Sequence, residues 1–246
     1  MLEIAGLTVT FGGLHALHDV DLHVGEEEVV GLIGPNGAGK TTLIDAVTGF
    51  VPCTADRLAF GDDDLAGATP AQRAGRGLVR TFQSLELFED LSVAENLQVA
   101  AETPRWWQPL VDAVRPQRDE AEGARWALDV LDLGAVADRR PDELSHGQRK
   151  LVAVARALAT RPRLVLLDEP GAGLDGEETE ALGERIRSLP GHGVAVLLVD
   201  HDMSLVLGTC ERVVVLETGS VIADGEPDAI RSDPAVVEAY LGTAAP

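Results

Sequence analysis

Basic residues are scarce in this chain of 246 residues. It holds 20 lysines and arginines against 41 aspartates and glutamates, which gives a formal net charge of −21 at pH 7. Only two lysines occur, Lys40 and Lys150. An acidic surface repels nucleic-acid backbones, so this balance argues against duplex binding as the main function. We interpret the excess of acidic residues as a source of solubility.

The chain also has few cysteines and no long apolar run. Cys53 and Cys210 lie far apart without CxxC spacing, so we expect neither a zinc site nor a disulfide framework, and a reducing cytosol is favoured. Residues 1–4 lack the charged and long apolar regions of a signal peptide. No apolar run approaches the ~18 residues that would suggest a membrane span. We therefore expect a cytoplasmic protein that meets a membrane only through partners.

The most informative stretch is residues 34–42, which match the phosphate-binding pattern G-x-x-x-x-G-K-[ST]. An apolar run at 29–33 precedes it and reads as a buried strand, whereas a helical pattern at 42–47 follows and ends at Gly49. A chance glycine-rich turn is the alternative, but every motif position is filled and both flanks fit. The residues of the motif are Gly34, Pro35, Asn36, Gly37, Ala38, Gly39, Lys40, Thr41 and Thr42.

The residue types of this motif follow from phosphate chemistry. Glycines let backbone N–H groups turn inward, and together with the N-terminus of the next helix they form a nest for phosphates. In this pattern Lys40 reaches the β- and γ-phosphates, and the hydroxyl of Thr41 ligates Mg²⁺. The sequence thus predicts a nucleotide site without yet specifying its chemistry.

The remaining pattern predicts an α/β core with an insertion. Continuous apolar runs at 164–167 and 194–199 suit parallel strands covered on both faces, and residues 1–33 suggest an antiparallel layer. Helices are expected from Pro70, from near Val93, at 119–132, at 149–161 and at 235–241. The three acids at 62–64 read as a solvated loop rather than a metal site. A helical insertion is expected between about residues 84 and 160.

Four further sites carry candidate chemistry. Asp168 and Glu169 end an apolar strand, where they could hold Mg²⁺ and polarise water, or only mark a strand-to-turn boundary. Ser145 opens a helix, as an anion site or as an ordinary N-cap. Gln83 lies between a strand and the insertion. His201 follows a strand end, where α/β sheets place active groups, although a lone histidine is usually structural.

In this order, the motifs resemble those of the nucleotide-binding domain of an ATP-binding cassette (ABC) ATPase. The stretch 144–148, Leu-Ser-His-Gly-Gln, resembles that family's signature, and the match covers essentially the whole chain. Within the family, the chain is similar to the ATP-binding subunits of branched-chain amino acid importers, the type called LivG; importers for urea and amides share much of the pattern. The residues that carry this likeness are 11–14, 48–50, 80–83, 87–88, 95–97, 172–174, 201–203 and 239–242.

The resemblance implies a role for each matching residue. Phe11, which could also be a core aromatic, would stack on adenine, and residues 34–42 would hold the phosphates of ATP. Asp168 would hold Mg²⁺ with Thr41, Glu169 would be the general base, and His201 would contact the γ-phosphate. Gln83 would touch Mg²⁺ or the attacking water. The residues implied to act across a dimer of two cassettes are Ser145, Gly147, Gln148 and Asp175.

The resemblance also implies the organisation and the partners. We expect one ABC ATPase domain over residues 1–246, of the P-loop NTPase fold. Residues 1–83 and 161–246 would form the α/β core with its β layer, and residues 84–160 the helical subdomain with the signature. The chain would sit on the inner face of the cell membrane through permease subunits, beside a second ABC ATPase subunit, and serve an external solute-binding protein indirectly, with no nucleic acid.

Three rival functions are weighed against this importer. A soluble ABC ATPase acting on DNA or the ribosome usually carries coiled-coil insertions, paired cassettes or basic surfaces, and none is evident here. A regulatory subunit that binds ATP without turnover is disfavoured by Glu169. An exporter cassette is commonly fused to its membrane domain, so a free-standing chain that closes with the stretch 239–242 is expected to serve import.

Overall fold

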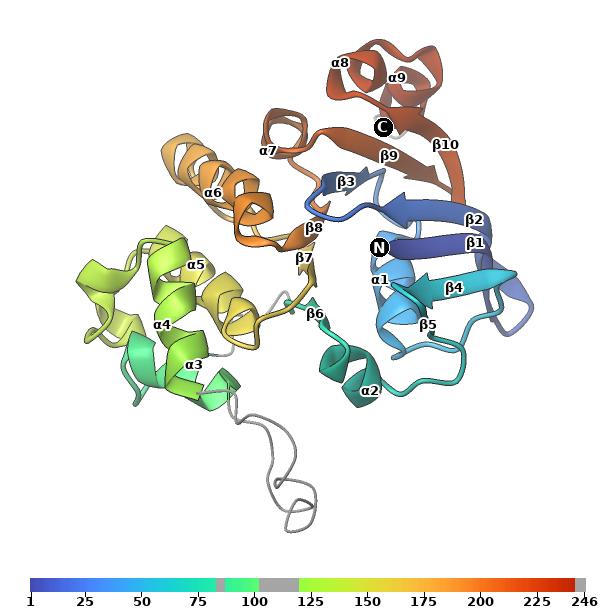
Figure 1. Cartoon of the computed structure of the whole chain (residues 1–246). Helices are drawn as coiled ribbons and strands as arrows, with labels where there is room; N and C mark the ends of the chain where they lie inside the picture. The colour runs from blue at the N-terminus through green and yellow to red at the C-terminus, as the bar shows by residue number, and fades with distance from the viewer. Residues whose placement is uncertain (83–86, 102–119, 242–246) are drawn as a thin grey trace, which may run out of the picture. The chain divides into compact units, whose positions relative to one another are not determined.

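The computed structural model describes residues 1–82, 87–101 and 120–241. The chain divides into two compact units, Met1–Gln83 with Arg163–Pro246, and Ser84–Pro162 (Figure 1). Each unit is described by itself below.

The first unit is built on a six-stranded sheet in the order β10-β9-β3-β8-β7-β6. Its strands are β3 (Val29–Ile33), β6 (Leu78–Arg80), β7 (Leu164–Asp168), β8 (Ala195–Val199), β9 (Arg212–Glu217) and β10 (Ser220–Gly225). All neighbours pair in parallel except β10, which returns antiparallel to β9. Every residue of β3, β7 and β8 is buried, which confirms the prediction of parallel strands covered on both faces.

A second, antiparallel sheet confirms the β layer expected at the N-terminus. Its order is β2-β1-β4-β5, with β1 (Leu2–Phe11), β2 (Leu14–Val24), β4 (Arg57–Phe60) and β5 (Asp63–Asp64). The stretch 62–64 is not simply a loop, because Asp63 and Asp64 pair with Phe60 and Ala59 at the sheet edge, although their side chains are exposed. One cluster of buried side chains joins both sheets to the helix after the phosphate loop; it includes Leu7, Phe60, Leu43, Ile44, Leu32 and Leu197.

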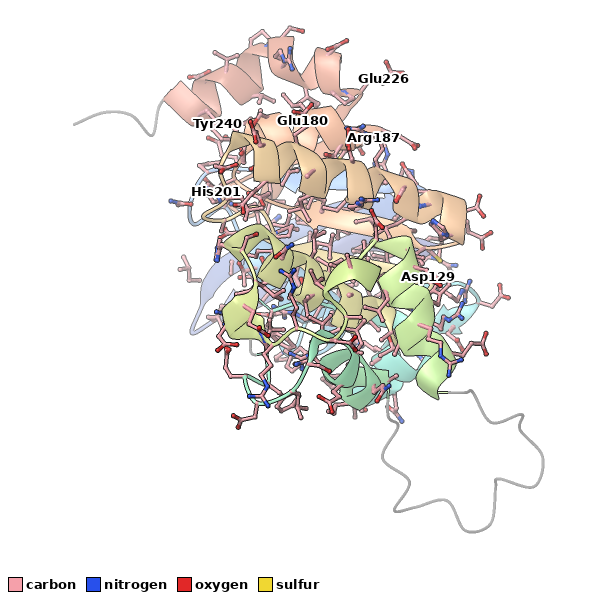
Figure 2. All side chains as sticks on the ribbon, turned by 90° about the vertical axis from the view of Figure 1, so that its left-hand side faces the viewer. Asp129, Glu180, Arg187, His201, Glu226 and Tyr240 are labelled. Carbon is pink, nitrogen blue, oxygen red and sulfur yellow. The ribbon has the colours of Figure 1, made fainter. Side chains whose placement is uncertain are left out.

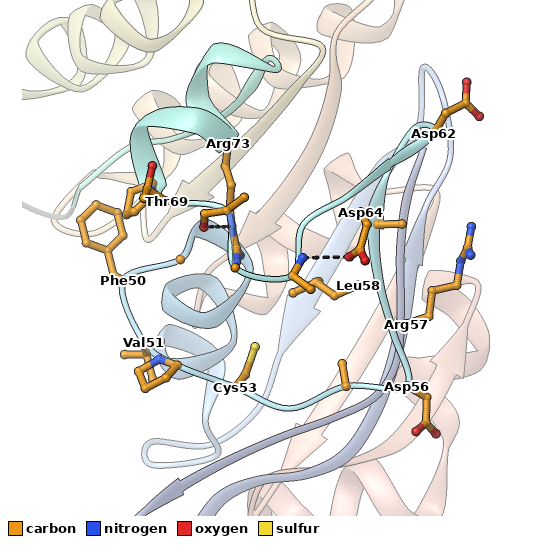
Figure 3. A pocket seen from close by; sticks show the side chains of 18 residues that line it. Phe50, Val51, Cys53, Asp56, Arg57, Leu58, Asp62, Asp64, Thr69 and Arg73 are labelled. Carbon is orange, nitrogen blue, oxygen red and sulfur yellow. Dashed lines mark hydrogen bonds between the residues drawn. The ribbon is translucent and has the colours of Figure 1, made fainter.

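This unit has six α-helices among its described residues. They are α1 (Lys40–Thr48), α2 (Pro70–Gly75), α6 (Gly176–Ser188), α7 (Met203–Thr209), α8 (Pro227–Ser232) and α9 (Pro234–Leu241). Gly49 closes α1 with a left-handed φ of 85°, and Thr69 opens α2 with a capping box. Residues of the stretch 49–73 line a hollow of about 740 Å³ (Figure 3).

The second unit is helical over its described residues. It contains α3 (Val93–Ala101), α4 (Glu120–Val130) and α5 (His146–Leu158). The Ser92 N–H donates to Glu95 Oε2 at 2.8 Å, and the Glu95 N–H donates to Ser92 Oγ at 3.2 Å. The helix expected near Val93 therefore begins with a capping box. Buried Asn96 donates to the backbone carbonyls of Phe88, Leu91 and Ser92, which ties the chain before α3 to the helix. Across both units, no helix among the described residues is long and apolar enough to cross a bilayer.

Candidate active site

The phosphate-binding loop follows β3 directly and turns into α1, as the motif predicts. Gly39 has φ 107°, and a Cβ there would meet the Ala16 carbonyl oxygen at 2.9 Å. A Cβ on Gly34 would come within 2.1 Å of the Leu216 carbonyl oxygen. At these two positions the backbone conformation and the close approach of neighbouring chain both require glycine. The loop is therefore held against β2 and β9 by contacts that a larger residue would break.

Lys40 lies inside this loop rather than in solvent. Its Nζ donates to the carbonyl oxygens of Gly34 at 2.7 Å and Pro35 at 3.1 Å, and the side chain is buried. Burial lowers the pKa of Lys40, whereas the nearby carboxylates of Glu169, Asp168 and Asp200 oppose that shift. The ammonium is the positive charge that the loop can offer to a phosphate.

A pocket of about 420 Å³ opens beside the loop. Its lining includes Glu169 together with residues of the loop, so the structure brings the end of β7 and the phosphate loop to one cavity. The residues that line it are Leu14, His15, Ala16, Asn36, Gly37, Gly39, Lys40, Thr41, Thr42, Glu169 and Thr218.

The pocket wall from β2 and from the β9–β10 turn was missed by the sequence analysis. Leu14, His15 and Ala16 begin β2 after the Gly12-Gly13 turn, and Thr218 lies in the turn between β9 and β10. Only the pairing of these hairpins brings them to the loop, and the His18 N–H donates to the Gly219 carbonyl at 2.8 Å to hold the two together. Phe11 is exposed and pairs with Leu14 across the hairpin, but it is not part of the lining.

The strand ends place Asp168, Glu169 and His201 near one another. Glu169 takes a left-handed φ of 50°, and its N–H donates to the Val199 carbonyl oxygen of β8 at 2.7 Å. His201 Nδ1 lies 3.8 Å from Glu169 Oε1, and the imidazole is 58% exposed. The His201 side chain is labelled in Figure 2. A non-glycine residue at positive φ directly after a strand is uncommon and is typical of functional sites.

Asp200 is a buried carboxylate that the sequence analysis did not single out. Its Oδ2 accepts the Gly171 N–H at 2.9 Å, and its Oδ1 accepts the Asp202 N–H at 3.0 Å. It therefore links the loop after Glu169 to the loop that carries His201, whose Nδ1 lies 3.5 Å from Asp200 Oδ1. Such a bridging role depends on two loops meeting in space, which one sequence does not reveal.

Asp168 is almost fully buried at the end of β7. Its backbone N–H donates to Thr81 Oγ1 at 3.2 Å, and its Oδ2 lies 3.3 Å from Arg80 Nη2. Its Oδ1 is buried and has no hydrogen-bond donor within the described ranges. Burial raises the pKa of Asp168, with Arg80 opposing and Glu169 and Asp45 adding to the increase.

The remaining predicted residues that the structure describes lie at the starts of helices. Ser145 and Gln148 cap α5 reciprocally, with Ser145 N–H to Gln148 Oε1 at 3.0 Å and Gln148 N–H to Ser145 Oγ at 3.2 Å, and Gly147 is in the first turn. Asp175 caps α6 by accepting the Glu178 N–H at 2.9 Å. The N-cap interpretation of Ser145 is thus confirmed. Gln83 falls outside the described residues.

Comparisons with known proteins agree with this geometry. A profile described as ABC transporter matches residues 17–172, and one described as branched-chain amino acid ATP-binding cassette transporter matches residues 220–246. The chain is 40% identical to the high-affinity branched-chain amino acid transport ATP-binding protein BraF of Pseudomonas aeruginosa, covering 99% of this chain and 98% of the relative. It is 39% identical to the corresponding LivG protein of Escherichia coli K12, with the same coverage.

Solved structures give the same result for the fold. A crystal structure of the ADP conformation of an ATP-binding cassette of an ABC transporter superposes with a TM-score of 0.84 at 34% identity, covering 98% of both chains. A nucleotide-free cassette from an ABC transporter superposes with a TM-score of 0.82 at 33% identity, again over 98% of both chains. The fold class and the family resemblance inferred from the motifs are confirmed, and the chain belongs to the ABC transporter family as an ATP-binding cassette, an ATPase that serves transport.

Proposed function

We propose that this chain hydrolyses ATP to energise an importer of branched-chain or chemically related amino acids. The observation that carries the proposal is the 420 Å³ pocket in which Lys40, Thr41 and Glu169 meet. A phosphate-binding loop and a carboxylate on one cavity are what phosphoryl transfer to water requires. The amino acid class is supported by the match of residues 220–246 and by the names of the relatives.

The residues present fit a magnesium ion. Asp168 offers a buried oxygen, Oδ1, that lacks a donor from the described residues, and hard oxygen ligands are those that Mg²⁺ prefers. Thr41, which belongs to the phosphate-binding loop, lines the pocket and could supply its hydroxyl as a second oxygen ligand of the ion. In this proposal Asp168 and Thr41, together with Gln83, hold the ion, which neutralises charge on the β- and γ-phosphates when bound.

The chain's own groups supply the rest of the mechanism. Backbone N–H groups of residues 34–42 and the Lys40 ammonium bind the phosphates, so Lys40 exchanges its carbonyl partners for phosphate oxygens. Glu169 orients and accepts a proton from the attacking water, and His201 contacts the γ-phosphate from the neighbouring loop. Leu14, His15 and Ala16 of β2, which line the pocket, and Phe11, which pairs with Leu14 outside the lining, would cover the adenine and ribose side. Catalysis is then mainly positioning and charge stabilisation.

Turnover in this proposal requires a second cassette. Ser145, Gly147 and Gln148, at the N-terminus of α5, would bind the γ-phosphate held by the opposite subunit. Asp175, at the exposed start of α6, would couple the two sites. Integral permease subunits would bind the cassettes at the inner face of the membrane, and an external solute-binding protein would deliver the amino acid without touching this chain.

The test replaces Glu169 with glutamine, which keeps the shape of the side chain and removes the base. We expect Glu169→Gln to bind ATP, to accumulate as an ATP-dependent dimer and to lose phosphate release by at least about a hundredfold. The matched control is Glu177→Gln, the same change at an exposed acid in the first turn of α6. Steady phosphate release by Glu169→Gln at the control's rate would remove Glu169 from the role of base.

A further inference from the structure

Arg80 connects three parts of the first unit through one guanidinium. The residue ends β6, and its side chain is only 9% exposed. Nη1 pairs with Asp45 Oδ1 on α1, and Nη2 lies 3.3 Å from Asp168 Oδ2 at the end of β7. A buried guanidinium is stable only when its donors are satisfied, and these two carboxylates satisfy donors on both of its arms.

Two phenylalanines cover the same guanidinium from the solvent side. The ring centroid of Phe82 lies 4.7 Å from Arg80 Cζ and that of Phe50 lies 5.6 Å away. The rings meet edge to face at 83° with centroids 6.0 Å apart, yet Phe50 is 55% and Phe82 51% exposed. Their geometry is that of a cation–π contact, which fixes the guanidinium against the carboxylates beneath it. We call Phe50 and Phe82 the aromatic cover.

The consequence falls on Asp168. Arg80 holds its Oδ2, and Thr81, the residue after β6, accepts its backbone N–H, so the end of β6 contacts both the side chain and the backbone of Asp168. With Oδ2 held in this way, the orientation of the carboxylate leaves Oδ1 as the oxygen without a described donor. Arg80 thereby decides which oxygen a cation can take.

We propose that Arg80 is a positioning residue that orients Asp168 toward the metal ion of the nucleotide site, and that the aromatic cover sets how firmly it does so. This rests on the proposed function, in which Asp168 holds Mg²⁺. The link gives an exposed surface of the unit a direct mechanical route to the catalytic centre. Whatever presses on or separates Phe50 and Phe82 changes the orientation of Asp168 through one side chain.

The experiment measures the Kd of ADP in MgCl₂ and in EDTA, and takes their ratio as the Mg²⁺ enhancement. Asp168→Asn is the reference for loss of the carboxylate. We expect Arg80→Gln to lower the enhancement about tenfold, the change that one lost charged contact of about 1.4 kcal/mol produces. Affinity in EDTA should change little, because Arg80 is not among the residues that line the nucleotide pocket.

A control separates positioning from mere structural support. Asp45→Asn breaks the other arm of Arg80 and leaves the Asp168 contact in place. It should retain most of the enhancement, whereas a loss equal to that of Arg80→Gln would mean that Arg80 acts only as a tie between α1 and β6, which overturns the inference. Arg80→Lys keeps the charge without the planar fork of the guanidinium and should recover part of the enhancement. If Arg80→Gln does not fold, Arg80→Lys is the variant that tests the positioning role.

The aromatic cover is tested by Phe82→Leu, a change at an exposed ring. We expect it to lower the Mg²⁺ enhancement about two- to fivefold, since an exposed cation–π contact has that effect on an equilibrium. Phe88→Leu is the matched control, because Phe88 is also exposed and covers a different guanidinium, that of Arg156. An enhancement in Phe82→Leu equal to that of Phe88→Leu would exclude the aromatic cover from the link.

The outcomes keep this inference apart from the proposed function. If Asp168→Asn keeps the full enhancement of the wild type, Asp168 is not a metal ligand and the proposed role of that residue fails. If Asp168→Asn loses the enhancement and Arg80→Gln keeps it, the metal role stands and the positioning role of Arg80 is refuted. Loss in both variants, with retention in Asp45→Asn, supports the inference.

Discussion

Replacing Arg73 by methionine should destabilise the first unit strongly. Arg73 lies in α2, yet its guanidinium is buried and reaches back to the C-terminal end of α1 (Figure 3). Nη1 donates to the carbonyl oxygens of Ala46 at 2.8 Å and Val47 at 2.7 Å. Nη2 donates to Leu65 at 2.9 Å, and Nε donates to Ala68 at 3.0 Å. One side chain thus caps α1 and ties it to the segment before α2.

The size of the loss in free energy of unfolding follows from which carbonyl oxygens lose their donor when the guanidinium is removed. The oxygens of Ala46 and Leu65 keep a second donor, the N–H groups of Gly49 and Ala68. Within the described residues, the oxygens of Val47 and Ala68 are served by Arg73 alone. The buried carbonyl of Val47 without a donor costs about 1–3 kcal/mol, and the part-buried carbonyl of Ala68 costs less because water can reach it. Methionine also removes the desolvation cost of the guanidinium, which offsets part of the penalty, so we expect a net loss of about 2–4 kcal/mol.

Urea denaturation followed by far-UV circular dichroism measures this loss. Arg76→Met is the matched control, because Arg76 lies one turn later and makes one exposed hydrogen bond to the Asp64 carbonyl and a long ion pair to Asp63. It should cost no more than about 0.5 kcal/mol. A loss below about 1 kcal/mol in Arg73→Met would show that the carbonyls find other partners, and the account of how α1 is anchored would be wrong.

Two further predictions concern titratable groups. Burial raises the pKa of the Cys210 thiol to about 12, and it also raises the pKa of Cys53, which is only half-buried. Because Cys53 is the more accessible of the two, a thiol reagent at pH 8 should label native Cys53 first. Labelling of native Cys210 as fast as in urea would contradict this prediction. Burial raises the pKa of Glu28, but the hydrogen bonds from Arg212 and Gly25 outweigh it and the pKa is lowered. The pair's stabilisation is present above the ordinary value of 4.5 and is lost as the pH falls through the folded pKa. The stability difference between wild type and Glu28→Gln in urea should therefore be large at pH 7 and shrink below about pH 4.5, whereas a constant difference would rule out the linkage.

The sequence predicted the local elements well because their signals are local. The loop at 34–42 needs glycines at fixed spacing, and the helix caps at Thr69, Ser92 and Ser145 need a side chain three residues from its partner. Unbroken apolar runs predict the buried strands β7 and β8. The family motifs then supplied the assignment that single patterns could not.

What the sequence did not predict depends on contacts between distant segments. The sequence analysis did not single out Arg73, and it named Arg80 only within the stretch 80–83 that carries the family likeness. The fold shows the two guanidiniums buried against carbonyls and carboxylates. Asp200 read as the neighbour of His201, whereas it joins two loops through backbone N–H groups. His15 entered the pocket lining because a hairpin turns it toward the phosphate loop. None of these placements follows from spacing along the chain.

The most direct test of the central claim is to isolate the tagged chain from its native cells in mild detergent and identify every protein that copurifies. The account predicts integral membrane subunits together with a second ATP-binding cassette, and an associated solute-binding protein that binds branched-chain or related amino acids. Copurification of ribosomes or DNA repair factors, with no membrane subunit, would contradict the proposal that this ATPase energises an importer.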